Sequence, residues 1–357
     1  MADTDVVNGD PLDREQPNDL SALKALWPFL KPYKFTMLSA FLALTLTAAV
    51  SLILPLAVRR VIDTFSSDNT LMLDQYFLAA IGIAGLLSIG TAVRYALVTR
   101  LGERVVTDIR KAVFGRVIHL SPQFFEKIMT GEVLSRITTD TTLILSVIGS
   151  SISVALRNIF IFIGGVILML LTSPKLTGLV FLIIPAIIIP ILLLGRRLRT
   201  LSRENQDWVA ASSSNASEAL MAVQTVQAFS HENLTKTSFD NVAEMNFSSA
   251  KKRIRTRSFL TVIVIFLIFS GIVGVLWVGA RDVRSELMSV GMLVQFVIYS
   301  IMVAGAAATL SEIWSELQRA AGATERLIEL LHIEDKVNDP LNAIAPPQSW
   351  YGEISFK

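Results

Sequence analysis

The chain has 357 residues, of which 52% are hydrophobic and only 17% are charged, with a mean hydropathy of +0.55 and a formal net charge of +2. Soluble proteins are typically about 25% charged, so this composition excludes an ordinary soluble protein and indicates an integral membrane protein. The sequence has no cysteine and only three histidines, which excludes disulfides and a cysteine nucleophile and argues against a metal centre.

The first 34 residues contain two expected elements. Residues 1–19 are polar and acidic, without the basic start and apolar core of a signal peptide or the Arg-rich, acid-poor composition of an organelle transit peptide. We therefore expect a disordered cytosolic tail there and a bacterial inner-membrane location. Residues 20–34 are amphipathic and carry Trp27, Phe29 and Tyr33, which predicts a short helix lying in the membrane interface.

Six apolar stretches follow, and each is long enough to cross the ~30 Å hydrocarbon layer as a helix. They cover residues 35–58, 77–98, 147–171, 176–195, 259–280 and 287–310. The connections after the second and fourth stretches are long and rich in lysine and arginine, whereas the others are short. Because basic residues near the ends of spans prefer the cytosol, we expect both long connections and both termini there.

The long connections are expected to be helical extensions of the spans. No glycine or proline occurs between Arg196 and Ser270, and a loop of that length without either residue is improbable. The segment must reverse once, so it predicts a hairpin of two arms reaching about 40 Å from the membrane. A shorter hairpin is expected over 99–146, with turns at Ser121–Pro122 and Gly131.

Polar residues within the apolar stretches are candidates for a substrate cavity. The candidates are Arg94, Arg157, Asn158, Gln295 and Tyr299. Two interpretations of the arginines stay open. They meet an anionic lipid headgroup or an acidic drug, or they extend to the interface or pair with Glu312 and Glu316. On the outer side we expect Asp63 to pair with Arg59 or Arg60. Three glycines are expected to allow close helix approach: Gly271, Gly274 and Gly279.

Three segments together resemble a known family. Residues 108–140 read DIRKAVFGRVIHLSPQFFEKIMTGEVLSRITTD, with a phenylalanine pair followed by a G-E-x-x-S-R-x-x-x-D pattern. Residues 217–232 read SEALMAVQTVQAFSHE, and residues 323–331 read ATERLIELL. This combination resembles the membrane domain of ATP-binding-cassette exporters of the bacterial half-transporter type, which move lipids, drugs or peptides.

The resemblance implies an all-α membrane fold of the type 1 exporter. Six long transmembrane helices with cytosolic extensions would occupy residues 35–331 and form a domain-swapped dimer with an identical or a different half-transporter. Short coupling helices would lie near 131–137 and 228–233 and contact nucleotide-binding domains. The first coupling loop would use Gly131, Glu132, Ser135, Arg136 and Asp140. The second would use Ala228, Phe229, Ser230, His231, Glu232 and Asn233. We expect Gly131 to form the tight turn and Phe229 to fill a pocket.

The last residues are expected to lead out of the membrane domain. Residues 332–349 would form a linker, and residues 350–357 (WYGEISFK) would form the first strand of a nucleotide-binding domain that these 357 residues do not include. No G-x-x-x-x-G-K-[ST] phosphate loop occurs in the sequence. We therefore expect no catalytic residue and no metal site in this chain, with ATP and Mg²⁺ bound by the missing domain.

The function expected from this resemblance is outward movement of an amphipathic substrate by alternating access, driven by ATP. The partners would be a second half-transporter, nucleotide-binding domains, membrane lipid and the substrate, with no nucleic acid. Two other classes stay open: a secondary transporter driven by an ion gradient, and a membrane scaffold or receptor that transports nothing. The first would require an acidic residue deep in the membrane, and none of the six stretches has one at its centre.

Overall fold

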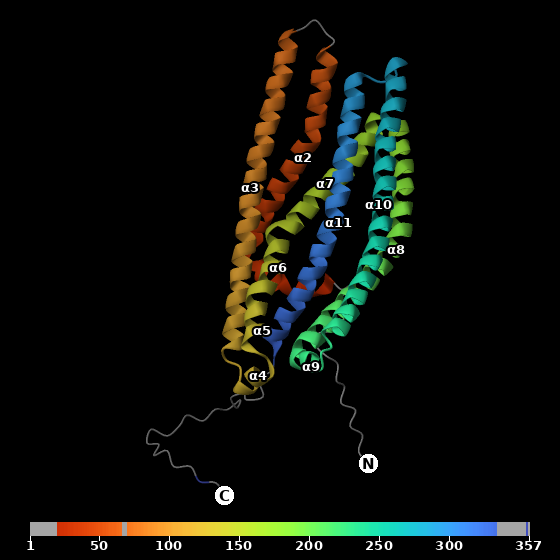
Figure 1. Cartoon of the computed structure of the whole chain (residues 1–357). Coiled ribbons are helices and arrows are strands. Elements are labelled where there is room, and N and C mark those ends of the chain that lie inside the picture. Colours follow the sequence, from red (N-terminus) through yellow and green to blue (C-terminus); the bar gives the residue numbers. More distant parts are fainter. Residues whose placement is uncertain (1–19, 66–69, 334–354, 356–357) are drawn as a thin grey trace, which may run out of the picture. The chain divides into compact units, whose positions relative to one another are not determined.

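The computed structural model describes residues 20–65, 70–333 and 355 (Figure 1). The expected acidic tail at 1–19 lies outside the described residues, as do nearly all of the expected linker and the expected strand. The N-terminal segment expected in the membrane interface is helical, and its place in the interface stays a prediction. It consists of η1 (Leu20–Leu26), α1 (Trp27–Leu30) and η2 (Lys31–Tyr33).

The remaining described elements are all helical, and three of them are longer than 45 residues. They are α2 (Lys34–Phe65), α3 (Thr70–Val117), α4 (Pro122–Lys127), α5 (Thr130–Ser135), η3 (Arg136–Asp140), α6 (Thr141–Ser146), η4 (Val147–Ser151), α7 (Ile152–Thr172), α8 (Pro174–Met221), α9 (Val223–Ala228), α10 (Glu232–Arg284) and α11 (Val290–His332). The elements η3 and η4 are π-helical turns, so α5 to α7 form one nearly continuous helical path interrupted by two wide turns.

The six predicted spans are confirmed, because the described residues contain six helices that are long and apolar enough to cross a membrane. The prediction that the spans continue as helices beyond the apolar stretches is confirmed too, while their cytosolic location stays a prediction. The helix α3 runs without a break from the second apolar stretch to Val117, and α8 runs from the fourth to Met221. The chain is therefore a multi-pass membrane protein whose spanning helices extend well beyond the apolar layer.

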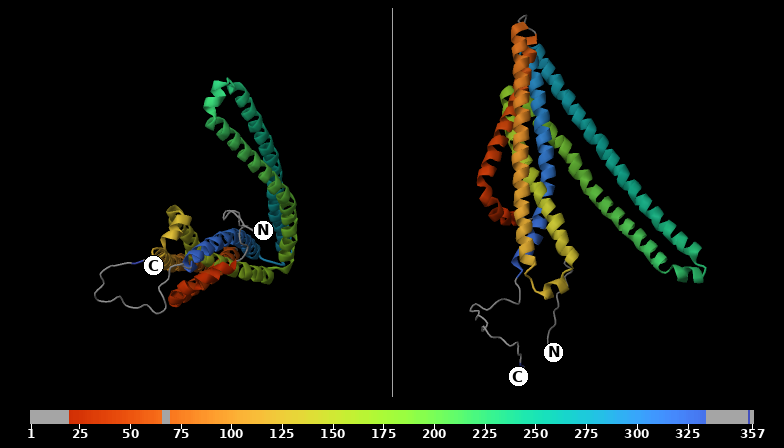
Figure 2. Two further views of the ribbon diagram at one scale, coloured as in Figure 1. Left: turned by 90° about the horizontal axis from the view of Figure 1, so that it is seen from below. Right: turned by 90° about the vertical axis from the view of Figure 1, so that its left-hand side faces the viewer.

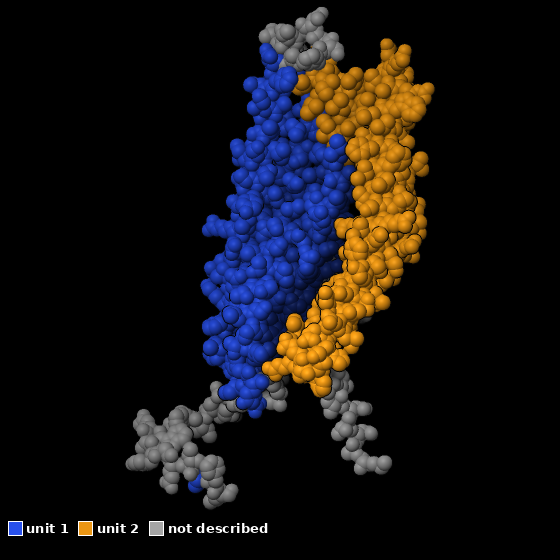
Figure 3. All heavy atoms as spheres, viewed as in Figure 1, with its two compact units in different colours: residues 1–57, 74–165, 301–357 blue, residues 58–73, 166–300 orange. Residues whose placement is uncertain are grey.

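The helices form two compact units, which Figure 3 distinguishes by colour. Unit 1 contains residues 1–57, 74–165 and 301–357, and unit 2 contains residues 58–73 and 166–300. Within unit 2, α8 and α10 run antiparallel along each other and are joined at one end by α9 (Figure 2). This is the predicted hairpin over residues 196–258.

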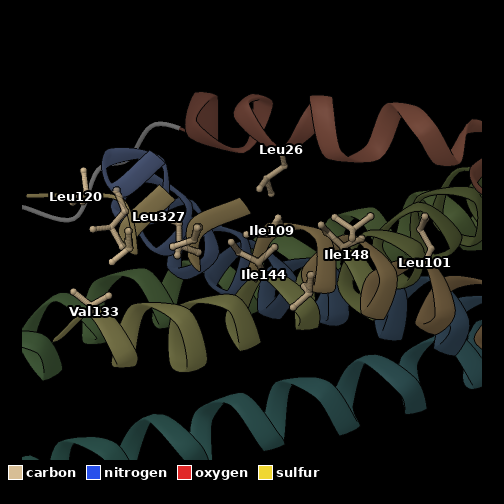
Figure 4. Packing of buried hydrophobic residues seen from close by; sticks show 13 residues of the cluster. Leu26, Leu101, Ile109, Leu120, Val133, Ile144, Ile148 and Leu327 are labelled. Carbon is tan, nitrogen blue, oxygen red and sulfur yellow. The ribbon is translucent and has the colours of Figure 1, made fainter. Parts of the chain in front are cut away.

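The core of unit 1 lies between the non-membrane portions of its helices (Figure 4). Val105, Ile109 and Val113 recur every four residues on α3, and each is at most 1% exposed. They pack in one cluster with Ile144 of α6 and Leu327 of α11. Because residues four apart share a helix face, α3 presents one continuous apolar stripe to its neighbours. The interface segment joins the same cluster through Leu26.

Close approach of helices at glycine is confirmed at two of the three predicted positions. In unit 2, a Cβ added to Gly271 would lie 3.0 Å from the Ile183 side chain, and one added to Gly279 would lie 2.2 Å from that of Leu293. The prediction is wrong for Gly274, where a Cβ would meet no atom within 4 Å. Spacing alone marked all three glycines, but only those on the packed face need to be small.

A close approach of two backbones at a glycine of unit 1 was not predicted, and it gives a stability test. A Cβ on Gly102 of α3 would lie 2.7 Å from the Cα of Gly149 in η4. The obstacle is backbone, so we expect Gly102→Ala to destabilise the protein by about 1–3 kcal/mol. The matched control is Gly115→Ala on the same helix, where the added methyl meets open space and should stabilise by up to about 1 kcal/mol. Thermal unfolding in detergent measures the stability of both variants, and equal melting temperatures for the two would contradict the close approach at Gly102.

Candidate functional site

The first reversal beyond the apolar stretches lies earlier in the chain than predicted. The helix α3 ends at Val117, α4 follows an extended Ser121, and Ile128 and Met129 are extended before α5 begins. The tip is therefore the segment 118–129, not the predicted 131–137. Gly131 is the second residue of α5, so its predicted role as the turn residue is wrong. The chain turns instead through extended residues, which need no glycine.

The side chains exposed at this tip were not among the predicted site residues. Phe124 packs against the core of unit 1, whereas Phe125 is 39% exposed and meets Phe124 edge to face at 5.1 Å. Met129 is exposed as well. The phenylalanine pair was the sequence feature that could have indicated this tip, because one ring can pack against the core while its neighbour is exposed. These two exposed apolar side chains are candidates for docking on a partner domain.

The motif after the tip forms an ion cluster within unit 1. Arg326 near the end of α11 donates two hydrogen bonds to Asp140, of 2.6 and 2.9 Å, and the Asp140 side chain is only 8% exposed. Arg136 donates to Glu132 at 2.6 Å and to the main-chain oxygen of Arg326 at 3.2 Å. The arrangement ties the returning arm of the first hairpin to α11. Three of the predicted loop residues, Glu132, Arg136 and Asp140, therefore form ion pairs within this chain, while Gly131 and Ser135 are exposed.

The second reversal lies close to its predicted place. The short helix α9 ends at Ala228, and all predicted residues from Ala228 to Asn233 are exposed. Ser230 adopts a left-handed backbone with φ of 52°, and His231 N–H donates to the Val226 carbonyl at 2.9 Å, which closes the turn. The Phe229 side chain is 71% exposed and points away from the packed face of the hairpin. The helix at this tip is thus Val223–Ala228, just before the predicted range.

Arg94 and Arg157 lie near each other in unit 1. Arg94 is 8% exposed and donates to the Ser153 hydroxyl at 2.8 Å, and its positive charge is close enough to that of Arg157 to repel it. The Nε atoms of both arginines are buried without a hydrogen-bond partner. Among the described residues neither arginine forms an ion pair with Glu312 or Glu316, so that expectation is wrong.

Glu316 binds a different side chain, and Asn158 binds its own helix. Glu316 accepts a 2.5 Å hydrogen bond from the hydroxyl of Ser151, the last residue of the π-turn η4. The Asn158 amide donates to the Val154 carbonyl of its own helix at 2.9 Å. One N–H of this NH₂ group is used in that bond, so Asn158 can offer its second N–H and its side-chain oxygen to another ligand.

Gln295 and Tyr299 are buried in unit 2, at 3% and 0% exposure. Gln295 accepts from Arg59 at 3.5 Å and donates to the Thr172 hydroxyl at 3.2 Å. Arg59 also forms the expected ion pair with Asp63, at 3.3 Å, and Asp63 accepts the Gly291 N–H at 3.0 Å. This network joins the C-terminal ends of α2 and α7 to the N-terminal part of α11. The role of Gln295 and Tyr299 as cavity residues stays a prediction.

The sequence that forms these six long helices and two reversals matches a described protein family. A family model of the ABC (ATP-binding-cassette) transporter transmembrane region matches residues 37–306. The chain belongs to this family. The match covers nearly all of the six apolar stretches and both reversals, and the family is a different one from the ion-gradient transporters that the sequence had left open.

Several curated ABC proteins are similar to this chain. A Rickettsia felis protein named as an export ATP-binding/permease protein is 28% identical over 88% of this chain and 54% of its own length. ABC transporter B family member 1 of Dictyostelium discoideum is 28% identical over 94% of this chain and 37% of its own length. The mitochondrial ATP-dependent permease MDL1 of Schizosaccharomyces pombe is 27% identical over 88% of this chain and 44% of its own length. The chain thus spans about half the length, or less, of these relatives.

Proposed function

We propose that this chain forms the membrane pathway of an ATP-driven exporter and that its two helical hairpins carry motion from nucleotide-binding domains to that pathway. The main support for this proposal is the length of the helix α10. Its 53 residues correspond to about 80 Å at 1.5 Å per residue, so roughly 50 Å extends beyond a ~30 Å hydrocarbon layer. An unbroken helix of that length transmits displacement from its exposed tip.

The tips have the chemistry of docking surfaces. The first exposes Phe125 and Met129 and the second exposes Phe229, and exposed apolar side chains of this size favour a protein partner over water. The partners proposed are nucleotide-binding domains that hold ATP and Mg²⁺, and a second half-transporter completing the pathway. In line with the segregation of basic residues, we place both tips and both termini in the cytosol of a bacterium, with the spans in its inner membrane.

The experiment for this function uses the full-length protein in sealed vesicles. We expect ATP-dependent movement of an amphipathic fluorescent substrate out of the compartment that holds the nucleotide-binding domains, together with ATP hydrolysis stimulated by that substrate. Vesicles given ADP, or a non-hydrolysable ATP analogue, should show no sustained movement. A protein that neither moves the substrate nor raises its ATP hydrolysis in response to it would instead support the scaffold or receptor alternative.

Arg94 and Arg157 are proposed to contact an anionic group of the substrate. Two like charges with buried, unpaired Nε atoms are better satisfied by an anion than by each other. We expect Arg157→Gln to raise the half-stimulating concentration of an anionic amphiphile in the ATPase assay by about tenfold, since hydrogen bonds to charged groups contribute about 1.5–3 kcal/mol.

The control for this substitution is Arg100→Gln, at an exposed position of α3 beyond the apolar stretch, which should leave the concentration unchanged. Stimulation by an uncharged amphiphile of similar size should be the same in both variants and in the unaltered protein. An equal loss for both amphiphiles would mean that Arg157 supports the packing of α7 and does not recognise an anion.

A further inference from the structure

A groove opens within unit 2 where α8 and α10 pass from their apolar stretches into their polar extensions. It has a volume of about 590 Å³. Gly195, Arg199 and Gln206 of α8 line it at spacings of four and seven residues, so they share one face of the helix. A Cβ added to Gly195 would meet no atom within 4 Å, which means that the missing side chain leaves space in the groove.

The groove lies at the boundary between hydrocarbon and polar headgroups. The apolar stretch of α8 ends at residue 195, and that of α10 begins at residue 259. Ile191 and Leu198 of α8 and Leu260 of α10 form its apolar wall. Arg199 and Arg203 line the other part and are both exposed. One site therefore combines a surface for acyl chains with two guanidinium groups.

The positive charge around the groove is uncompensated. In the described part of the chain, Arg199 and Arg203 form no ion pair. No acidic residue occurs on α8 from Pro174 to Arg203, or on α10 from Met245 to Arg281. The nearest acidic residues on the two helices, Glu204, Asp207 and Glu244, do not line the groove. Further basic residues flank it: Arg196, Arg197, Lys251, Lys252, Arg253, Arg255 and Arg257.

We propose that this groove binds an anionic phospholipid of the leaflet it faces. The phosphate would lie against Arg199 and Arg203, whose planar guanidinium groups bind phosphate through paired hydrogen bonds, with Ser202 and Gln206 donating to the remaining oxygens. An acyl chain would pack on Ile191 and Leu260. Clusters of basic residues directly beside a membrane span attract anionic lipids. The site is separate from the proposed substrate contact, which lies in unit 1, and it does not depend on export activity.

The test measures lipid retention by the full-length protein, purified in detergent micelles that contain equal amounts of phosphatidylglycerol and phosphatidylcholine. Native mass spectrometry counts the lipids of each kind that stay bound. We expect the unaltered protein to prefer phosphatidylglycerol. In the double variant Arg199→Gln with Arg203→Gln, the ratio of retained phosphatidylglycerol to phosphatidylcholine should fall about thirtyfold. Each basic residue near an anionic surface contributes about a fivefold increase in binding, and the variant removes two. The control double variant, Arg196→Gln with Arg197→Gln, removes two charges that do not line the groove.

A second variant separates a lipid from a free anion. Gly195→Leu fills the groove but keeps both arginines, so it should lower phosphatidylglycerol retention while leaving inorganic phosphate binding unchanged. If phosphate alone competes fully and Gly195→Leu has no effect, the site binds a small anion and the lipid proposal is overturned. It is overturned as well if the control double variant loses as much preference as the groove variant. Unchanged retention in every variant would mean that the groove is covered by another protein surface, such as a second copy.

Discussion

Substitution Phe229→Ala should uncouple ATP hydrolysis from transport in the full-length protein while leaving its assembly intact. The Phe229 ring is 71% exposed at the second tip, so its removal costs little packing within this chain. An exposed aromatic ring that fills a partner's pocket typically contributes 2 kcal/mol or more at an interface. We expect transport to fall at least tenfold, with basal ATP hydrolysis largely retained, and the ratio of substrate moved to ATP consumed measures the effect.

The matched control for this variant is Phe247→Ala on the same hairpin. Phe247 is 64% exposed and lies about 22 Å along α10 from the start of that helix, too far to contact a domain docked at the tip. Size-exclusion chromatography of both variants should report the same oligomeric state as the unaltered protein. Unchanged transport by Phe229→Ala would remove this residue from the coupling role.

Substitution Asp140→Asn should weaken coupling through a different route, because it breaks the cluster that joins the first hairpin to α11. Asp140 is buried and accepts both hydrogen bonds from Arg326, but the Arg326 side chain is 47% exposed, which reduces the contribution of the pair. We expect a loss of about 2 kcal/mol in stability and fewer substrate molecules moved per ATP. The double variant Asp140→Arg with Arg326→Asp should recover part of both losses, and a double-mutant cycle measures that interaction.

Lys175 and Asp282 in unit 2 provide the control ion pair. They are 2.6 Å apart, and the Asp282 side chain is 10% exposed, which resembles the burial of Asp140. Asp282→Asn should therefore lower stability by a similar amount without changing the ratio of transport to ATP hydrolysis. If both asparagine variants reduce that ratio equally, the effect of Asp140→Asn reflects stability alone, and the cluster does not link the hairpin to α11.

Hydropathy and helix-breaking residues predicted the spans and the longer hairpin well, since both depend on local composition. Residues 196–258 had no glycine or proline, and the structure is helical there apart from the turns on either side of α9. The first tip was misplaced because the reversal uses extended Ile128 and Met129 instead of the conspicuous Gly131. Glycine marks a turn only where the backbone needs a positive φ, and this turn does not.

The pairing of Asp140 with Arg326 could not be predicted from one sequence. The two residues are 186 positions apart, and no local periodicity relates them. The resemblance of the G-E-x-x-S-R-x-x-x-D pattern to the family's first loop assigned Arg136 and Asp140 to the coupling loop. The structure places them on the returning arm, where α11 offers a closer ion partner. By contrast, Arg94 and Arg157 could be selected as candidates from the sequence, since a basic residue in or near an apolar stretch is visible there, and their role in a cavity stays a prediction.

The π-turns η3 and η4 give the path from α5 to α7 a property that a regular helix of the same length would lack. Each wide turn holds one residue more than an α-helical turn, and one residue corresponds to a rotation of about 100° around the axis. The side chains before, between and after these turns therefore point in directions that are rotated relative to one another around the helix axis. Asp140 can face α11 while Gly149 faces α3, and neither orientation dictates which side of α7 meets lipid.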